Sequence, residues 1–129
     1  MAEAGAAPQI VAIVDDDPFI RTALGRLVRS RGHEAVVFDD ARAVLAHPGL
    51  GDLSCILADL QMPGMNGVEL IQILAGRVPS PPVVAMTAYP GEAIRQRALE
   101  AGAAAYLTKP FDAAQLQACL QALGITGGM

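Results

Sequence analysis

Short apolar runs alternate with longer amphipathic segments five times along this chain. The apolar runs occupy residues 9–14, 35–38, 55–58, 83–86 and 104–107. Continuous apolar runs of this length are typical of strands that are buried on both faces of a parallel sheet. Each run is followed by a segment with apolar residues at helical spacing, which is the pattern of repeated strand–helix units. The sequence therefore predicts an α/β fold with helices on both faces of one sheet.

The expected helices begin and end at recognisable residues. They run from Pro18 to Gly32, from Asp40 to His47, over residues 67–77 and 90–101, and from Asp112 to Leu123. Aspartate ahead of a helix, proline in its first turn and glycine after its end are the usual signals. Residues 79–82 contain three prolines and are expected to form a rigid connector. His33 and His47 lie in turn-like contexts, so we expect both on the surface.

The length and composition indicate one domain. The chain has 129 residues, enough for a real core. Residues 9–124 should form the domain, with a disordered lead-in at 1–8 and a short tail at 125–129. Although 53% of the residues are hydrophobic, no run approaches the ~20 apolar residues of a membrane span. The N-terminal residues also lack the pattern of a secretory signal, so we expect a cytoplasmic protein without a membrane segment.

Charge and cysteine content exclude two further classes. The net charge is -4 and the nine Lys and Arg residues are scattered, whereas nucleic-acid binding needs a basic face. Direct binding to nucleic acid is therefore not expected. Cys55 and Cys119 lie far apart and form no CxxC pair, so we interpret them as core residues and not as a redox couple.

Polar residues stand where four of the expected strands end. Three acids, residues 15–17, follow the first run, Asp59 follows the third, Thr87 follows the fourth, and Lys109 comes shortly after the fifth. A Pro-Gly pair after Asp59 opens this strand end onto a loop. Because the carboxyl ends of parallel strands meet at one edge of the sheet, we expect these side chains to form one site.

These residue types favour the chemistry of phosphate on a carboxylate. Asp15, Asp16 and Asp59 would make an oxygen-rich site of the kind that Mg²⁺ prefers, and without a cation three clustered acids would repel one another. A threonine hydroxyl and a lysine ammonium can hold phosphoryl oxygens. The set supplies a nucleophile, a metal site, a hydroxyl donor and a cation. Asp17 is as well suited to cap the helix ahead of Pro18 and is left out of the site.

Four motifs in order resemble the receiver domain of bacterial two-component response regulators. They are Ile13-Val14-Asp15-Asp16-Asp17, Ala58-Asp59-Leu60-Gln61-Met62-Pro63-Gly64-Met65-Asn66-Gly67, Met86-Thr87-Ala88 and Tyr106-Leu107-Thr108-Lys109-Pro110-Phe111. Each motif alone is weak, but together they are specific, and the resemblance covers residues 9–123. It implies a flavodoxin-like (βα)5 three-layer sandwich with a five-stranded parallel sheet in the order 2-1-3-4-5.

The resemblance also implies a role for each of the acids. It implies that Asp59 is the phosphoacceptor and that Asp15 and Asp16 bind Mg²⁺ together with Asp59. Asp16 would be the more direct ligand, and Asp15 would act more through water. The backbone carbonyl of Gln61 would complete the share of the Mg²⁺ shell that the protein provides.

Three residues on the fourth and fifth strands receive roles in the same way. Thr87 and Lys109 would hold the phosphoryl oxygens. Tyr106 falls at the position of a switch aromatic, which turns inward when Thr87 moves toward the phosphate. An aromatic residue also suits a strand without any switching role, so both readings of Tyr106 stay open. The Lys109–Pro110 bond is expected to be cis.

The implied function is that of a phosphoacceptor in a phosphorelay, not of an enzyme with outside substrates. The domain would catalyse only its own phosphorylation and slow dephosphorylation. Its phosphodonor would be a histidine kinase or a histidine phosphotransfer protein. Its output would be a downstream protein, or its own output domain if the chain belongs to a longer regulator. The face formed by residues 90–101, residues 104–107 and the last helix would change on phosphorylation and is a possible homodimer surface.

Three alternatives can be compared with the same residues. A phosphatase of the haloacid dehalogenase type has a second Asp two residues after its nucleophile, and here that residue is Gln61. A flavodoxin-like nucleotide-binding module would need a phosphate loop, and neither a Gly-x-Gly-x-x-Gly nor a Walker-type run occurs. A degenerate receiver that serves only as an interaction scaffold would lack an acid or the lysine, and all of them are present.

Overall fold

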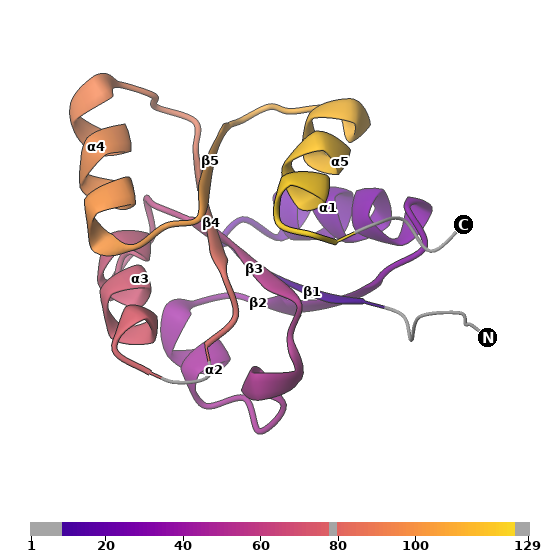
Figure 1. The fold of residues 1–129 in the computed structure, drawn as a ribbon, viewed down its shortest axis with the longest axis horizontal. Coiled ribbons are helices and arrows are strands. Elements are labelled where there is room, and N and C mark those ends of the chain that lie inside the picture. The colour runs from indigo at the N-terminus through magenta and orange to yellow at the C-terminus, as the bar shows by residue number, and fades with distance from the viewer. Residues whose placement is uncertain (1–8, 78–79, 126–129) are drawn as a thin grey trace.

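The computed structural model describes residues 9–77 and 80–125, which form a parallel sheet between two layers of helices (Figure 1). The strands are β1 (Ile10–Val14), β2 (Glu34–Phe38), β3 (Cys55–Asp59), β4 (Val83–Thr87) and β5 (Ala105–Thr108). The helices are α1 (Pro18–Ser30), α2 (Ala41–Leu45), α3 (Gly67–Ala75), α4 (Glu92–Ala101) and α5 (Ala113–Ala122), and a 3₁₀ turn lies at Leu50–Asp52. The strand order is β2-β1-β3-β4-β5, so the predicted α/β fold and the predicted order are both confirmed.

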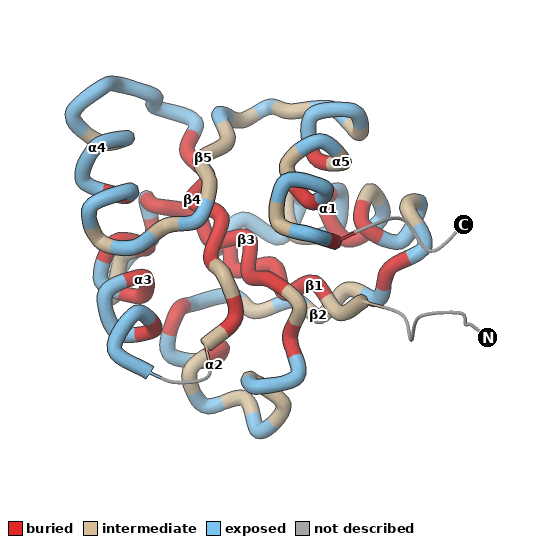
Figure 2. Tube along the Cα trace, in the orientation of Figure 1, coloured by how far each residue is buried: buried red, intermediate tan, exposed pale blue. Residues whose placement is uncertain are grey.

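Alternation along the strands divides the core between the two faces of the sheet. In β1, Val11 and Ile13 belong to the cluster that α1 and α5 cover, whereas Ala12 and Val14 belong to the cluster beneath α2, α3 and α4. Figure 2 shows the central strands as the most buried part of the chain. Every residue of β3 and of β4 is buried, which is why these strands appear in the sequence as unbroken apolar runs.

Side-chain caps fix the starts of the helices. Asp17 caps α1, since its Oδ1 accepts a hydrogen bond from the N–H of Phe19 at 2.9 Å. Asp40 caps α2 in the same way. Asp112 and Gln115 form a capping box at the start of α5. The cap at Asp17 matters for the site, because it fixes the chain directly after the acids at the end of β1.

Several helix ends lie one or two residues inside the expected bounds. Helix α4 begins at Glu92 and not at Pro90, because Gly91 takes an extended conformation as the N-cap residue. Helix α3 ends at Ala75, two residues before the expected end, with Gly76 as its C-cap. Hydrophobic patterning constrains the middle of an element far more than its ends, so shifts of this size are ordinary.

The expected surface position of His33 is wrong. His33 lies in the turn between α1 and β2 but is only 6% exposed. Its burial lowers the pKa of the imidazole, because apolar surroundings disfavour the charged form. His47 is half-buried and packs edge-on against Phe38, with 5.3 Å between the ring centroids. Both residues are thus buried or half-buried, so a turn-like sequence did not guarantee exposure.

Both cysteines are free thiols: Cys55 is buried in the core beneath α1 and α5, and Cys119, on α5, is partly buried and packs against that core. Burial raises the pKa of the Cys55 thiol to about 12, and the nearby Cys119 contributes in the same direction. A thiol with a raised pKa holds little reactive thiolate at neutral pH. This environment agrees with their interpretation as packing residues.

The predicted lead-in at 1–8, Pro79 of the connector and residues 126–129 of the tail lie outside the described residues. Ile125, which was placed in the tail, is buried against the α1 and α5 core, and its N–H donates to the carbonyl of Leu120 at 2.8 Å. Within residues 9–77 and 80–125, no helix is both long and apolar enough to cross a membrane.

Candidate functional site

The side chains predicted to form the site lie together at the carboxyl end of the sheet. Asp15 directly follows β1, Asp59 and Thr87 are the last residues of β3 and β4, and Lys109 follows β5. Strand β3 lies between β1 and β4, so the ends of these neighbouring strands flank Asp59. Asp15, Asp59 and Thr87 are all buried. The site is therefore built on rigid strand ends in the middle of the sheet.

Three carboxylates meet at this edge. One oxygen from each of Asp15, Asp16 and Asp59 lies within 4.8 Å of the other two. Asp16 is exposed, whereas Asp15 and Asp59 are buried. Carboxylate oxygens at this spacing could share one hard cation. The structure thus brings together the three acids that the sequence singled out for metal binding.

Lys109 bridges two of these acids. Its Nζ lies 2.7 Å from Asp15 Oδ2 and 3.3 Å from Asp59 Oδ2, and its side chain is 10% exposed. Burial by itself lowers the pKa of Lys109, but the hydrogen bond to Asp15 and the charges of both carboxylates outweigh it, so the pKa is raised. The lysine therefore stays protonated and holds a positive charge beside Asp59.

The hydrogen bond and the positive charge at the Asp59 carboxylate do not fully offset the cost of burying its negative charge. Oδ1 accepts a hydrogen bond from the N–H of Gln61 at 3.0 Å, and Oδ2 faces Lys109. Burial raises the pKa of Asp59 and the charge of Asp15 adds to this, while Gln61 and Lys109 act in the opposite direction without cancelling it. Further positive charge at the cluster would favour the ionised, nucleophilic form of Asp59.

Thr87 is held by two hydrogen bonds at the end of β4. Its Oγ1 donates to Oε1 of Gln61 at 2.7 Å and accepts from the N–H of Tyr89 at 2.9 Å. From the sequence, Gln61 was expected to act only through its backbone carbonyl. Its side-chain contact with Thr87 joins the Asp59 loop to β4 and was not anticipated.

Tyr106 lies on β5 beside Ala85 of β4. The residue is half-buried and packs against the core beneath α2, α3 and α4. Its hydroxyl oxygen is buried and has no hydrogen-bond partner among the described residues. The structure thus places the ring in the interior, and the switching role of Tyr106 stays a prediction.

Two residues that the sequence analysis missed position the acids. Arg21 donates from Nη1 to the backbone carbonyl of Asp15 at 2.7 Å, which ties α1 to the acid loop. Gly67 begins α3 so close to β3 that a Cβ there would lie 2.4 Å from the carbonyl oxygen of Asp59. Nothing in the sequence distinguishes Arg21 from the other arginines of α1. The Asn-Gly pair after the Asp59 loop was the available signal for Gly67.

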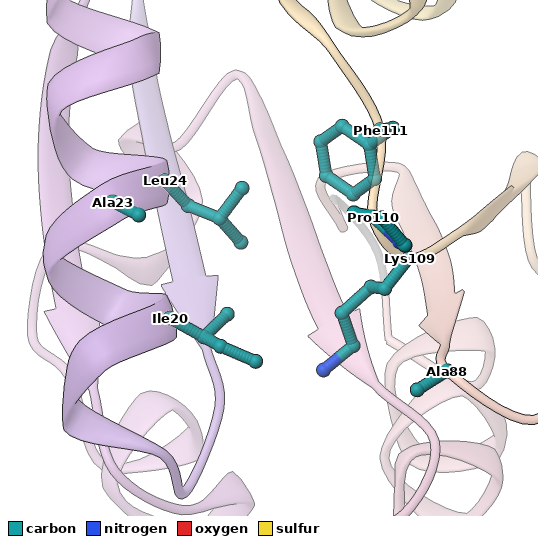
Figure 3. A pocket seen from close by; sticks show the side chains of 7 residues that line it. All are labelled: Ile20, Ala23, Leu24, Ala88, Lys109, Pro110 and Phe111. Carbon is teal, nitrogen blue, oxygen red and sulfur yellow. The ribbon is translucent and has the colours of Figure 1, made fainter.

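An apolar cavity of about 340 Å³ lies beside Lys109. Figure 3 shows its two walls, one from α1 and one from the segments that follow β4 and β5. The lining residues are Ile20, Ala23, Leu24, Ala88, Lys109, Pro110 and Phe111. The Lys109–Pro110 bond is cis, as expected. The charged site therefore opens beside an apolar surface.

Comparison with known proteins gives the same family from sequence and from structure. The family described as "Response regulator receiver domain" matches residues 11–121. Response regulator protein FleR of Pseudomonas aeruginosa is 40% identical over 106 residues, which cover 82% of this chain and 22% of that protein. Transcriptional regulatory protein FixJ of Bradyrhizobium diazoefficiens is 34% identical over 112 residues, which cover 86% of this chain and 54% of FixJ.

A solved structure agrees with these relatives. The response regulator receiver protein from Burkholderia phymatum has a TM-score of 0.79 and 36% identity, over 94% of this chain and 99% of that one. The chain spans about half or less of the length of FleR and FixJ. The chain belongs to the receiver domains of two-component response regulators.

Proposed function

We propose that this receiver domain accepts a phosphoryl group on Asp59 in a Mg²⁺-dependent reaction. The observation that carries the proposal is the position of the Asp59 carboxylate, which lies 3.3 Å from Lys109 Nζ and within the cluster formed with Asp15 and Asp16. Lys109 lies closer to Asp15, at 2.7 Å, than to Asp59, and Asp16 is exposed. Asp59 is therefore the buried acid best placed to receive a phosphoryl group between a cation and a metal site.

The donor set fits a divalent cation. Three carboxylates face one ammonium at the cluster, so the site carries uncompensated negative charge. Asp15, Asp16, Asp59 and the backbone carbonyl of Gln61 would hold Mg²⁺. Bound there, the ion would neutralise charge on the acids and on the phosphoryl oxygens.

The reaction assigns one task to each remaining side chain. An oxygen of Asp59 attacks the phosphorus of a phosphohistidine, the P–N bond breaks as the P–O bond forms, and the imidazole leaves with a proton from solvent. Lys109 and Thr87 hold the phosphoryl oxygens. The domain catalyses only its own phosphorylation and slow dephosphorylation, so it is a signalling phosphoacceptor and not an enzyme with outside substrates.

We propose a histidine kinase or a histidine phosphotransfer protein as the donor, acting in the cytoplasm. The apolar cavity beside Lys109 supports docking of a protein donor at this edge, because it offers contact surface next to the charged site. The output would be a downstream protein, or an output domain if the chain belongs to a longer regulator. The relatives FleR and FixJ extend well beyond the matched region, which supports the second form.

The proposed switch links the site to the face formed by α4, β5 and α5. Thr87 would turn toward the phosphoryl group, and Tyr106 would follow into the space beside β4. Tyr106 neighbours Ala85 on the sheet and packs against the core beneath α4, which supports the route. This face is the proposed partner or homodimer surface.

The first test is a mass measurement on the intact domain. Incubation with Mg²⁺ and acetyl phosphate, a small donor, should add one phosphate to the protein. If Mg²⁺ is omitted, or if EDTA is present from the start, the adduct should not form, because the acids at the site would then lack a counter-charge. An adduct that forms equally well without a divalent cation would contradict the metal-dependent reaction.

The metal site predicts a change in thermal stability. Mg²⁺ should raise the melting temperature of the wild-type domain, since an ion at 100 times its Kd stabilises the native state by about 2.7 kcal/mol. An Asp15→Asn/Asp16→Asn variant should lose this Mg²⁺-dependent rise. Asp39→Asn/Asp40→Asn alters a matched pair of exposed acids after β2 and should keep it. An equal rise in wild type and in the Asp15/Asp16 variant would show that the ion binds elsewhere.

A further inference from the structure

The side chain of Gln61 accepts a hydrogen bond from the Thr87 hydroxyl, which the proposed reaction needs as a donor. Thr87 Oγ1 donates its hydrogen bond to Gln61 Oε1 at 2.7 Å. The hydroxyl also accepts from the N–H of Tyr89 at 2.9 Å. A threonine hydroxyl has one proton to donate, so the bond to Gln61 uses its whole donor capacity. Thr87 cannot donate to a phosphoryl oxygen until this bond breaks.

Gln61 is placed to compete directly with the phosphoryl group. Its backbone N–H binds Asp59 Oδ1 at 3.0 Å, while its side chain reaches the end of β4. Gln61 itself is exposed, whereas Thr87 is fully buried. An exposed side chain thus accepts the hydrogen bond of a buried hydroxyl, so it can move into solvent without disturbing the core. The contact is therefore a removable restraint and not part of the packing.

We propose that the Gln61 side chain is a positioning residue that restrains the Thr87 hydroxyl in the unphosphorylated domain and so weakens binding of a phosphoryl group. This inference rests on the proposed function, because it concerns regulation of the same site. When only a fraction of the molecules is in the state that binds a ligand, the apparent affinity for the ligand is reduced by that fraction. The residue type at position 61 then sets the balance between the restrained and the free hydroxyl.

The size of the effect follows from the strength of one neutral hydrogen bond. Such a bond contributes on the order of a factor of 2 to 10 to an equilibrium after exchange with water. Methionine has nearly the length of glutamine but no strong acceptor. A Gln61→Met variant should therefore leave Thr87 free to donate and should bind a phosphoryl mimic about 2- to 10-fold more tightly than wild type.

The test measures binding of beryllofluoride, a phosphoryl mimic, with Mg²⁺ by calorimetry. Wild type and Gln61→Met are compared first, and the same change is then made in a Thr87→Val background, which lacks the hydroxyl. The concentration of beryllofluoride is raised to saturate the weaker variants. We expect tighter binding for Gln61→Met alone and less than about a 2-fold effect in the Thr87→Val background, because only the hydroxyl couples the two positions.

The direction of the change in beryllofluoride affinity and its dependence on the Thr87 hydroxyl distinguish this role from a structural one. A variant that merely disturbed the loop would bind beryllofluoride more weakly, and it would do so in both backgrounds. Unchanged or weaker binding by Gln61→Met, or the same gain without the Thr87 hydroxyl, would overturn the inference while wild-type binding still supports the phosphoacceptor function. Absence of any Mg²⁺-dependent binding by wild type would overturn both.

Discussion

An Asp59→Asn variant should gain no phosphate from acetyl phosphate and Mg²⁺ under conditions that label the wild-type domain. The substitution keeps the shape of the side chain but removes the nucleophilic carboxylate and one negative charge of the acid cluster. The loss should be complete, because Asp15 holds the shorter contact to Lys109 and Asp16 is exposed, so neither is placed to replace Asp59. Intact-mass measurement over a time course would check the result.

Asp39→Asn is the matched control for this experiment. Asp39 also follows a strand at the carboxyl edge of the sheet, since it comes directly after β2, but it is exposed and lies outside the acid cluster. This variant should be phosphorylated like wild type. Normal labelling of Asp59→Asn, or loss of labelling in Asp39→Asn, would place the phosphoacceptor elsewhere.

A Gly67→Ala variant should lose both stability and phosphorylation. The added Cβ would lie 2.4 Å from the carbonyl oxygen of Asp59 and 2.9 Å from Cα of Leu60. Both neighbours are backbone atoms, so no side chain can rotate away, and α3 must move off the end of β3. Overpacking of this kind costs about 1–3 kcal/mol or more, which should lower the melting temperature by on the order of 5–15 °C. The displaced Asp59 should also be labelled more slowly.

Gly51→Ala separates the steric effect from the general effect of replacing glycine. A Cβ at Gly51 would meet no atom within 4 Å. This variant should change the melting temperature by no more than a few degrees, because the residue is exposed and the added methyl has open space. Equal melting temperatures for Gly67→Ala and wild type would show that the approach of α3 to Asp59 does not restrain the site.

The sequence predicted the sheet well because its strands are buried on both faces. The runs that became β3 and β4 contain only residues that tolerate complete burial until the last position, where Asp59 and Thr87 stand. Polar residues at those two positions mark the edge of the sheet unambiguously. The end of α3 and the start of α4 were predicted less closely, since Gly76 and Gly91 cap these helices through backbone conformation and leave no side-chain pattern.

The identities of the charged site residues were predictable, but their pairing was not. Residue type and position at a strand end were enough to group Asp15, Asp59 and Lys109. The sequence could not show that Lys109 lies closer to Asp15 than to Asp59, because that choice depends on side-chain paths across the sheet. The bond between Gln61 and Thr87 joins residues 26 positions apart, and it arises only because β3 and β4 are neighbours.

The burial of His33 could not be predicted from the sequence. A polar residue between Gly32 and Glu34 is typical of an exposed turn, yet His33 is only 6% exposed. No local pattern carries this information, because it depends on how α1 packs against the sheet.

The most direct test of the account is to locate the phosphate on the wild-type chain. The domain is labelled with acetyl phosphate and Mg²⁺, the acyl phosphate is reduced with borohydride, and the peptides are mapped by mass spectrometry. Reduction converts a phosphorylated aspartate to homoserine, and the account predicts homoserine at position 59 alone. Homoserine at position 15 or 16, or phosphate retained on a hydroxyl side chain, would contradict Asp59 as the phosphoacceptor.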